Sequence, residues 1–111
     1  MTNIVVQPIH LLISDAILHR SIMFNFCLKT FLNDGLLLEI SNNHLYSTSE
    51  ILKEIYRLLN KFNLLEYFKI KNYYTIMSKK SNCIIISLKK EYNNFSDISK
   101  LRALIRLQGK L

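Results

Sequence analysis

A Ser-x-x-Glu motif at Ser47 and Glu50 constrains the fold of this 111-residue sequence most, because it predicts where a helix begins. In such a capping box the serine oxygen accepts from a backbone N–H of the first turn, and the glutamate accepts from the serine N–H. Apolar residues follow at three- and four-residue steps, and charged residues fill the opposite side. We therefore predict an amphipathic helix over 49–62, closed by Asn63, a residue type that tolerates left-handed backbone geometry.

The sequence after this helix has patterns typical of strands. Residues 65–70 and 73–77 are rich in aromatic and β-branched residues, and 83–88 form a compact apolar run. The basic stretch 78–82 predicts a turn between them, and hence an antiparallel hairpin. An antiparallel sheet can leave one face open to solvent or RNA.

Helical spacing also runs through the first third of the chain, where Pro8 suits a first helical turn. The turn signal Asn33-Asp34-Gly35 ends this segment, and 36–40 predict a short buried strand. The apolar residues with this spacing are Ile9, Leu12, Ile13, Ala16, Ile17, Met23, Phe24, Cys27, Leu28 and Phe31.

Together these elements predict one α+β domain over 1–111, with two helices packed on a small, mostly antiparallel three-stranded sheet in the order α-β-α-β-β. Half of the residues are hydrophobic, which is enough for one packed core. Residues 97–107 fit either a helix or another strand. We expect the core to include Ile51, Ile55, Leu59, Leu64 and Ile85.

No motif for catalysis is evident. The three histidines, His10, His19 and His44, do not have the spacing of a metal site. Cys27 and Cys83 fit packed thiols in a reducing compartment, and two glycines cannot form a Gly-rich phosphate loop. We expect no enzyme, no metal and no cofactor.

The net charge of +7 comes from the second part of the chain. Residues 1–66 carry five basic and six acidic groups, whereas 67–111 carry ten basic groups against Glu91 and Asp97. Such an excess favours a polyanionic partner, with cations on phosphates and aromatic rings on unpaired bases. The basic candidates are Lys69, Lys71, Lys79, Lys80, Lys89, Lys90, Lys100, Arg102, Arg106 and Lys110.

The stretch 46–70 resembles the family of small-subunit ribosomal protein eight, with Ser49 on the family's helix-opening serine and Leu58-Leu59 on its aliphatic pair. Pro8-Ile9 is similar to the family's opening motif, and residues 84–89 to its next strand. The resemblance implies an N-terminal α-β-α-β-β domain that helps assemble the central domain of small-subunit ribosomal RNA without catalysis. It adds Ser49 to the predicted RNA-binding residues.

The resemblance also implies neighbouring small-subunit proteins as partners. The chain ends where the family's C-terminal domain would begin, so we expect that domain to be absent, or supplied by a separate chain. The dominance of residues with AT-rich codons, and an N-terminus unlike a presequence, predict an organelle-encoded protein of the mitochondrial matrix and its ribosome.

An accessory subunit of an organellar membrane complex is the alternative, with the first apolar segment in or on the bilayer. Residues 4–32 are rather apolar, but charged and polar residues interrupt them repeatedly. We therefore expect no spanning helix and no membrane partner.

Overall fold

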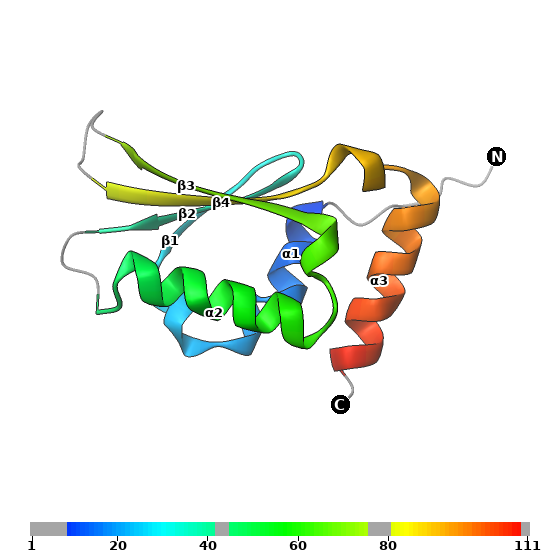
Figure 1. Cartoon of the computed structure of the whole chain (residues 1–111), viewed down its shortest axis with the longest axis horizontal. Helices are drawn as coiled ribbons and strands as arrows, with labels where there is room; N and C mark the ends of the chain where they lie inside the picture. Colours follow the sequence, from blue (N-terminus) through cyan, green and yellow to red (C-terminus); the bar gives the residue numbers. More distant parts are fainter. Residues whose placement is uncertain (1–8, 42–44, 76–80, 110–111) are drawn as a thin grey trace.

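A computed structural model describes residues 9–41, 45–75 and 81–109 as an α+β fold (Figure 1). The chain begins with helix α1 (Ile9–Ala16), the 3-10 turns η1 (Leu18–Arg20) and η2 (Ile22–Phe26), and strands β1 (Leu28–Phe31) and β2 (Gly35–Ile40). Helix α2 (Thr48–Lys61), turn η3 (Leu65–Tyr67), strands β3 (Phe68–Thr75) and β4 (Ser81–Leu88), turn η4 (Lys90–Tyr92) and helix α3 (Phe95–Gly109) follow.

The four strands form one antiparallel sheet in the order β1-β2-β4-β3. Its two central strands place Leu36 opposite Ile86 and Leu38 opposite Ile84, and all four side chains are buried. Figure 1 shows α1 and α2 on the same side of this sheet and α3 at one end. One face of the sheet therefore forms the core with the helices.

The apolar stripe of α2 packs into this core as the sequence predicts. Ile51, Ile55, Leu59 and Leu64 are all fully buried. The prediction for Ile85 is wrong, because Ile85 pairs with Leu37 and alternates with the buried Ile84 and Ile86, so it lies on the other face of the sheet.

The α+β class is confirmed, but the sheet has four strands and not three. The predicted first helical segment ends at Ala16, and residues 28–31 form the additional strand β1. The break follows at Ser21, whose backbone is extended and whose hydroxyl accepts from the Met23 N–H at 3.3 Å. This local hydrogen bond competes with a continuing helix.

The predicted turn at Asn33-Asp34-Gly35 is present and joins β1 to β2. Its glycine is required by a close approach of the neighbouring strand. A Cβ atom at Gly35 would lie 2.2 Å from the Ile86 carbonyl oxygen and 2.9 Å from the Ser87 Cα. Any other residue would push β4 away from β2.

Both ends of α2 agree with the sequence. The Glu50 N–H donates to Ser47 Oγ at 3.1 Å, and the Ser47 N–H donates to Glu50 Oε1 at 3.3 Å. Asn63 has a φ of 58°, the left-handed geometry expected after the helix. Helix α2 is thus defined by contacts within a few residues of its ends.

The structure also tests the predictions for residues 97–107 and for the β3–β4 hairpin. Residues 97–107 are helical, within α3, whose buried residues Ile98, Leu101 and Ile105 follow helical spacing. The β3–β4 hairpin is present, although 65–67 form the turn η3 and not the start of a strand. Pro8 and most of the predicted turn at 78–82 lie outside the described residues.

Candidate nucleic-acid interface

The face of the sheet away from the helices carries two of the predicted RNA-binding lysines. Lys69 and Lys71 are exposed and alternate with the core-facing Phe68 and Ile70. The Lys89 N–H donates to the Tyr67 carbonyl at 2.9 Å, which continues the β3–β4 pairing by one position. Lys69 and Lys71 lie on the same face of β3, about 7 Å apart. Lys89 follows the end of β4, is half-buried, and lines a cavity with Asn60, Asn63 and Glu66 at the end of α2 and in η3.

The centre of this open face is apolar. Leu37 and Ile85 are half-buried, and Leu28 on the edge strand β1 is 65% exposed. Cys83 lies on the same face, because it is two residues from Ile85 in β4 and pairs with Glu39 of β2. Its side chain is only 2% exposed. The lysines therefore border an apolar strip at the β3 edge of the sheet.

Lys90 is exposed at the start of η4, but acidic residues surround this end of the molecule. Partial burial and the nearby carboxylates of Glu66, Glu91 and Asp97 raise the pKa of Tyr92. A phosphate close to Lys90 would meet these three carboxylates as well. Lys69 and Lys71 lie on β3, outside this turn.

The cations of α3 do not converge on one surface. Arg102 and Arg106 are four residues apart and share a side of the helix, whereas Lys100 precedes Arg102 by two residues and points elsewhere. Lys100 and Arg106 are exposed. Arg102 is half-buried, and its Nε has no hydrogen-bond acceptor among the described residues.

Ser49 is exposed in the first turn of α2, at the end of the molecule opposite α3 (Figure 1). The fold thus separates it from the α3 cations, in a molecule about 48 Å long. Lys79, Lys80 and Lys110 lie outside the described residues.

Three of the described aromatic residues of the basic half take part in packing, whereas Phe95 of α3 is 57% exposed. Phe68 is buried in the core, and the rings of Tyr67 and Tyr92 pack against each other with centroids 4.9 Å apart. These three rings are not free to stack on bases. The side chains of Tyr73 and Tyr74 are outside the description, so the visible chemistry of this surface is contact with phosphates.

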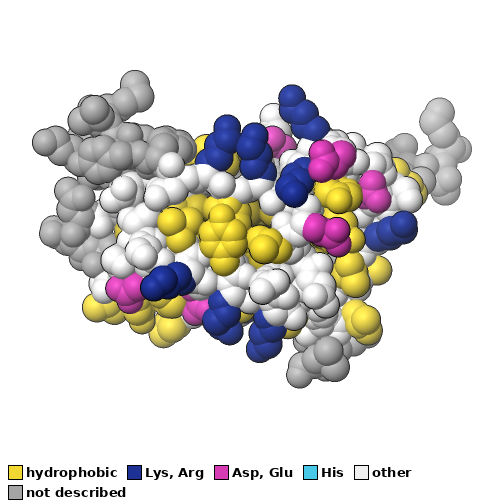
Figure 2. All heavy atoms as spheres, viewed as in Figure 1, with side chains coloured by type: hydrophobic (Ala, Val, Ile, Leu, Met, Phe, Trp, Pro, Cys, Tyr) yellow, Lys and Arg dark blue, Asp and Glu magenta, His cyan; other side chains and the backbone are white. Residues whose placement is uncertain are grey.

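A second cluster of cations lies at the C-terminal end of α2, which the sequence did not indicate. Arg20 from η1 joins Arg57 and Lys61 of α2 around a cavity of about 570 Å³, whose other lining residues are Leu58, Phe62 and Gln108. Figure 2 shows basic side chains along the α2 edge and along the β3 edge, on either side of an apolar patch.

Two of these cations lie close to the ring of Phe62. The Arg20 guanidinium carbon lies 3.9 Å from the centroid of the Phe62 ring, and the Lys61 ammonium lies 5.5 Å from it. Cation–π attraction stabilises each charge over the ring.

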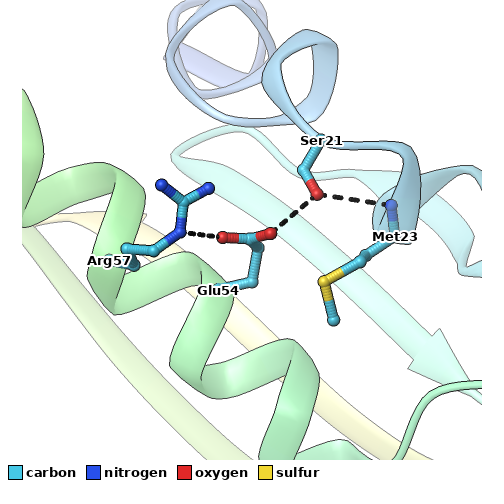
Figure 3. Close-up of polar contacts among 4 residues, drawn as sticks. All are labelled: Ser21, Met23, Glu54 and Arg57. Carbon is cyan, nitrogen blue, oxygen red and sulfur yellow. Dashed lines mark hydrogen bonds and ion pairs between the residues drawn. The ribbon is translucent and has the colours of Figure 1, made fainter.

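The third cation of the cavity is fixed by Glu54 (Figure 3). The Nε of Arg57 donates to Glu54 Oε1, and the Ser21 hydroxyl donates to Glu54 Oε2 at 2.9 Å. These contacts, chiefly the one from Arg57, hold the pKa of Glu54 below its ordinary value. Figure 3 shows the terminal nitrogens of Arg57 pointing away from Glu54, so they can still contact a ligand.

The Nε2 atom of His19 lies 3.4 Å from the Ser14 hydroxyl and 4.0 Å from a carboxylate oxygen of Asp15. His10 packs against Phe31 with ring centroids 4.9 Å apart, and His44 lies outside the description. Burial raises the pKa of the Cys27 thiol to about 11, so the thiol is protonated at neutral pH. No group of three potential metal ligands occurs within 9–41, 45–75 and 81–109.

Over those same residues, no helix has the length and apolar character needed to span a bilayer. No family model, no curated protein and no solved structure matches this chain.

Proposed function

We propose that this protein is a structural, RNA-binding constituent of the mitochondrial small ribosomal subunit. It contacts the central domain of the ribosomal RNA and adjacent small-subunit proteins, and it supports translation without catalysing a reaction. The observation that carries this proposal is the open face of the sheet, where Lys69 and Lys71 lie beside an apolar strip.

Two further observations support the proposal. The net charge of +7 suits a polyanionic partner, because each lysine that contacts a phosphate releases a counterion. The elements α1, β2, α2, β3 and β4 also follow each other in the α-β-α-β-β order that the resemblance to the ribosomal family implies, with β1 and α3 in addition.

Sedimentation of solubilised mitochondria on a sucrose gradient, with and without ribonuclease, tests the assignment. The protein should sediment with the small ribosomal subunit and leave that fraction after ribonuclease. Sedimentation with a membrane complex, indifferent to ribonuclease, would contradict the proposal and favour an accessory subunit of such a complex.

The double variant Lys69→Gln/Lys71→Gln tests the surface itself. Loss of two phosphate contacts should lower the steepness of the salt dependence of single-stranded RNA binding by about 1.4 in log–log slope. The matched control is Lys29→Gln/Lys53→Gln, which removes the same charge from β1 and from α2. Equal slopes for the two variants would show that the open face does not touch RNA.

A further inference from the structure

The cavity at the C-terminal end of α2 joins cations that are distant in the sequence. Arg20 comes from the turn after α1, Arg57 and Lys61 come from α2, and Gln108 of α3 closes the wall. The Gln108 amide donates to the Phe62 carbonyl at 2.8 Å, which fixes α3 against the end of α2. Three separate elements therefore build this site, and they hold its side chains in place.

The cavity keeps an excess of positive charge. The described residues that line it include no carboxylate. Glu54 stands beside Arg57 and compensates one of the three charges. Arg20 uses its Nε on the Asp15 carbonyl at 3.3 Å, and the rest of its guanidinium lies over Phe62. The net charge around the cavity is thus about two positive units, available to an anion.

Hydrogen bonds within the fold satisfy carbonyl groups at this end of the helix. The C-terminus of a helix is its negative end and by itself disfavours an anion. Here four of the carbonyls around this end accept hydrogen bonds within the fold. Leu58, Leu59, Asn60 and Phe62 accept from Phe62, Leu64, Asn63 and Gln108 respectively.

From this arrangement we infer that the cavity between α2, η1 and α3 binds a phosphate group. Guanidinium groups donate two parallel hydrogen bonds to phosphate oxygens, and an ammonium group adds a point charge. A volume of about 570 Å³ exceeds the need of a lone carboxylate and admits a phosphate with its attached sugar. The inference rests on the proposed function for its source of phosphate, which is the RNA backbone; inorganic phosphate and a nucleoside monophosphate share the same chemistry.

The test uses the variant Arg20→Gln/Lys61→Gln, with Lys29→Gln/Lys53→Gln as the control of equal net charge. In NMR titrations with inorganic phosphate, the side-chain amide signal of Gln108 should shift in the wild type and in the control, but not in the cavity variant. In binding to a labelled oligouridylate, the cavity variant should lower the log–log salt slope by about 1.4 relative to the control.

The outcomes separate the two proposals. A cavity variant that matches the control in both titrations overturns the phosphate site, whatever the RNA affinity of the wild type. A wild type that binds phosphate at Gln108 but does not bind RNA supports the site with free phosphate or a nucleotide as its ligand, and it overturns the proposed function. If the cavity variant fails to fold, Arg20→Lys/Lys61→Arg keeps both charges. It should retain the Gln108 shift, and loss of that shift in a folded protein would contradict a site that depends on charge.

Discussion

Glu54 connects two segments of the molecule that are 33 residues apart in sequence. Its carboxylate accepts from Ser21, at the break between η1 and η2, and from Arg57, one turn further along α2. The Ser21 hydroxyl in turn accepts from the Met23 N–H, so the carboxylate also orients the cap of η2. This four-residue network fixes the irregular segment 17–27 against the helix and positions one wall of the cationic cavity.

We predict that Glu54→Gln lowers the free energy of unfolding by about 1–2 kcal/mol at neutral pH, because hydrogen bonds to a charged group are lost. The partial exposure of Arg57 limits the size of this loss. The pKa of Glu54 is lowered in the folded state, so its contribution is fully present above the ordinary value of 4.5. It is lost as the pH falls through the lowered pKa. Urea unfolding of both proteins at several pH values measures this difference.

The control for this prediction is Glu66→Gln, which removes an exposed carboxylate. The same pH dependence in both variants would contradict a specific role for Glu54. A double-mutant cycle with Ser21→Ala should give a coupling of about 0.5–1.5 kcal/mol.

Gly35→Ala is expected to destabilise the fold by about 2–3 kcal/mol. The new Cβ would meet backbone atoms of Ile86 and Ser87, which cannot rotate away as a side chain can. Thr30→Ala, at an exposed position of β1, should change stability by less than about 0.5 kcal/mol. Chemical denaturation of the two variants compares them directly, and a neutral Gly35→Ala would show that β2 and β4 can separate freely.

At the scale of elements, the sequence predicts best where the decisive contacts are local. The beginning and end of α2 depend on Ser47, Glu50 and Asn63, which lie within or beside the element that they define. Strand β1 has no such signal. Its residues 28–31 fit a helical as well as an extended spacing, and three of the four are exposed, so no alternation marks a buried face.

We predict that Ser47→Ala costs about 1 kcal/mol, because it leaves the first turn of α2 without its hydroxyl acceptor. Ser49→Ala, two residues later in the same turn, should alter stability by less than about 0.5 kcal/mol. Thermal unfolding followed by circular dichroism distinguishes the two. Equal losses would mean that the capping box does not define this helix end in solution.

For the molecule as a whole, the sequence predicts which helix faces the core but not how distant segments meet. Four of five predicted core residues are buried, and the fifth, Ile85, is wrong because the pairing register of β4 decides its face. The cationic cavity could not be predicted for a similar reason, because it also depends on how distant segments pack. Arg20 belongs to the part of the chain with no net positive charge, and only the packing of η1 on α2 brings it to Lys61.

Truncation of one side chain buried in the core should lower the free energy of unfolding strongly. Leu59→Ala should lower the free energy of unfolding by about 2–5 kcal/mol, since the residue is fully enclosed. Leu107→Ala on α3 removes the same atoms from a side chain that is 64% exposed, and should cost less than about 0.5 kcal/mol. Denaturant midpoints at constant m-value provide the measurement, and similar losses for both would contradict a closed core.

The strand order β1-β2-β4-β3 has a consequence for the time course of folding. Each outer strand pairs with its neighbour in sequence, so the two hairpins can form on the microsecond scale. The central pair of strands is β2 and β4. The paired residues of these strands that are closest in sequence are 40 and 82, and α2 lies between them in the chain. Closing this long loop costs entropy before any contact between β2 and β4 forms. We therefore expect the hairpins and α2 to form early, and the docking of β4 onto β2 to limit the folding rate.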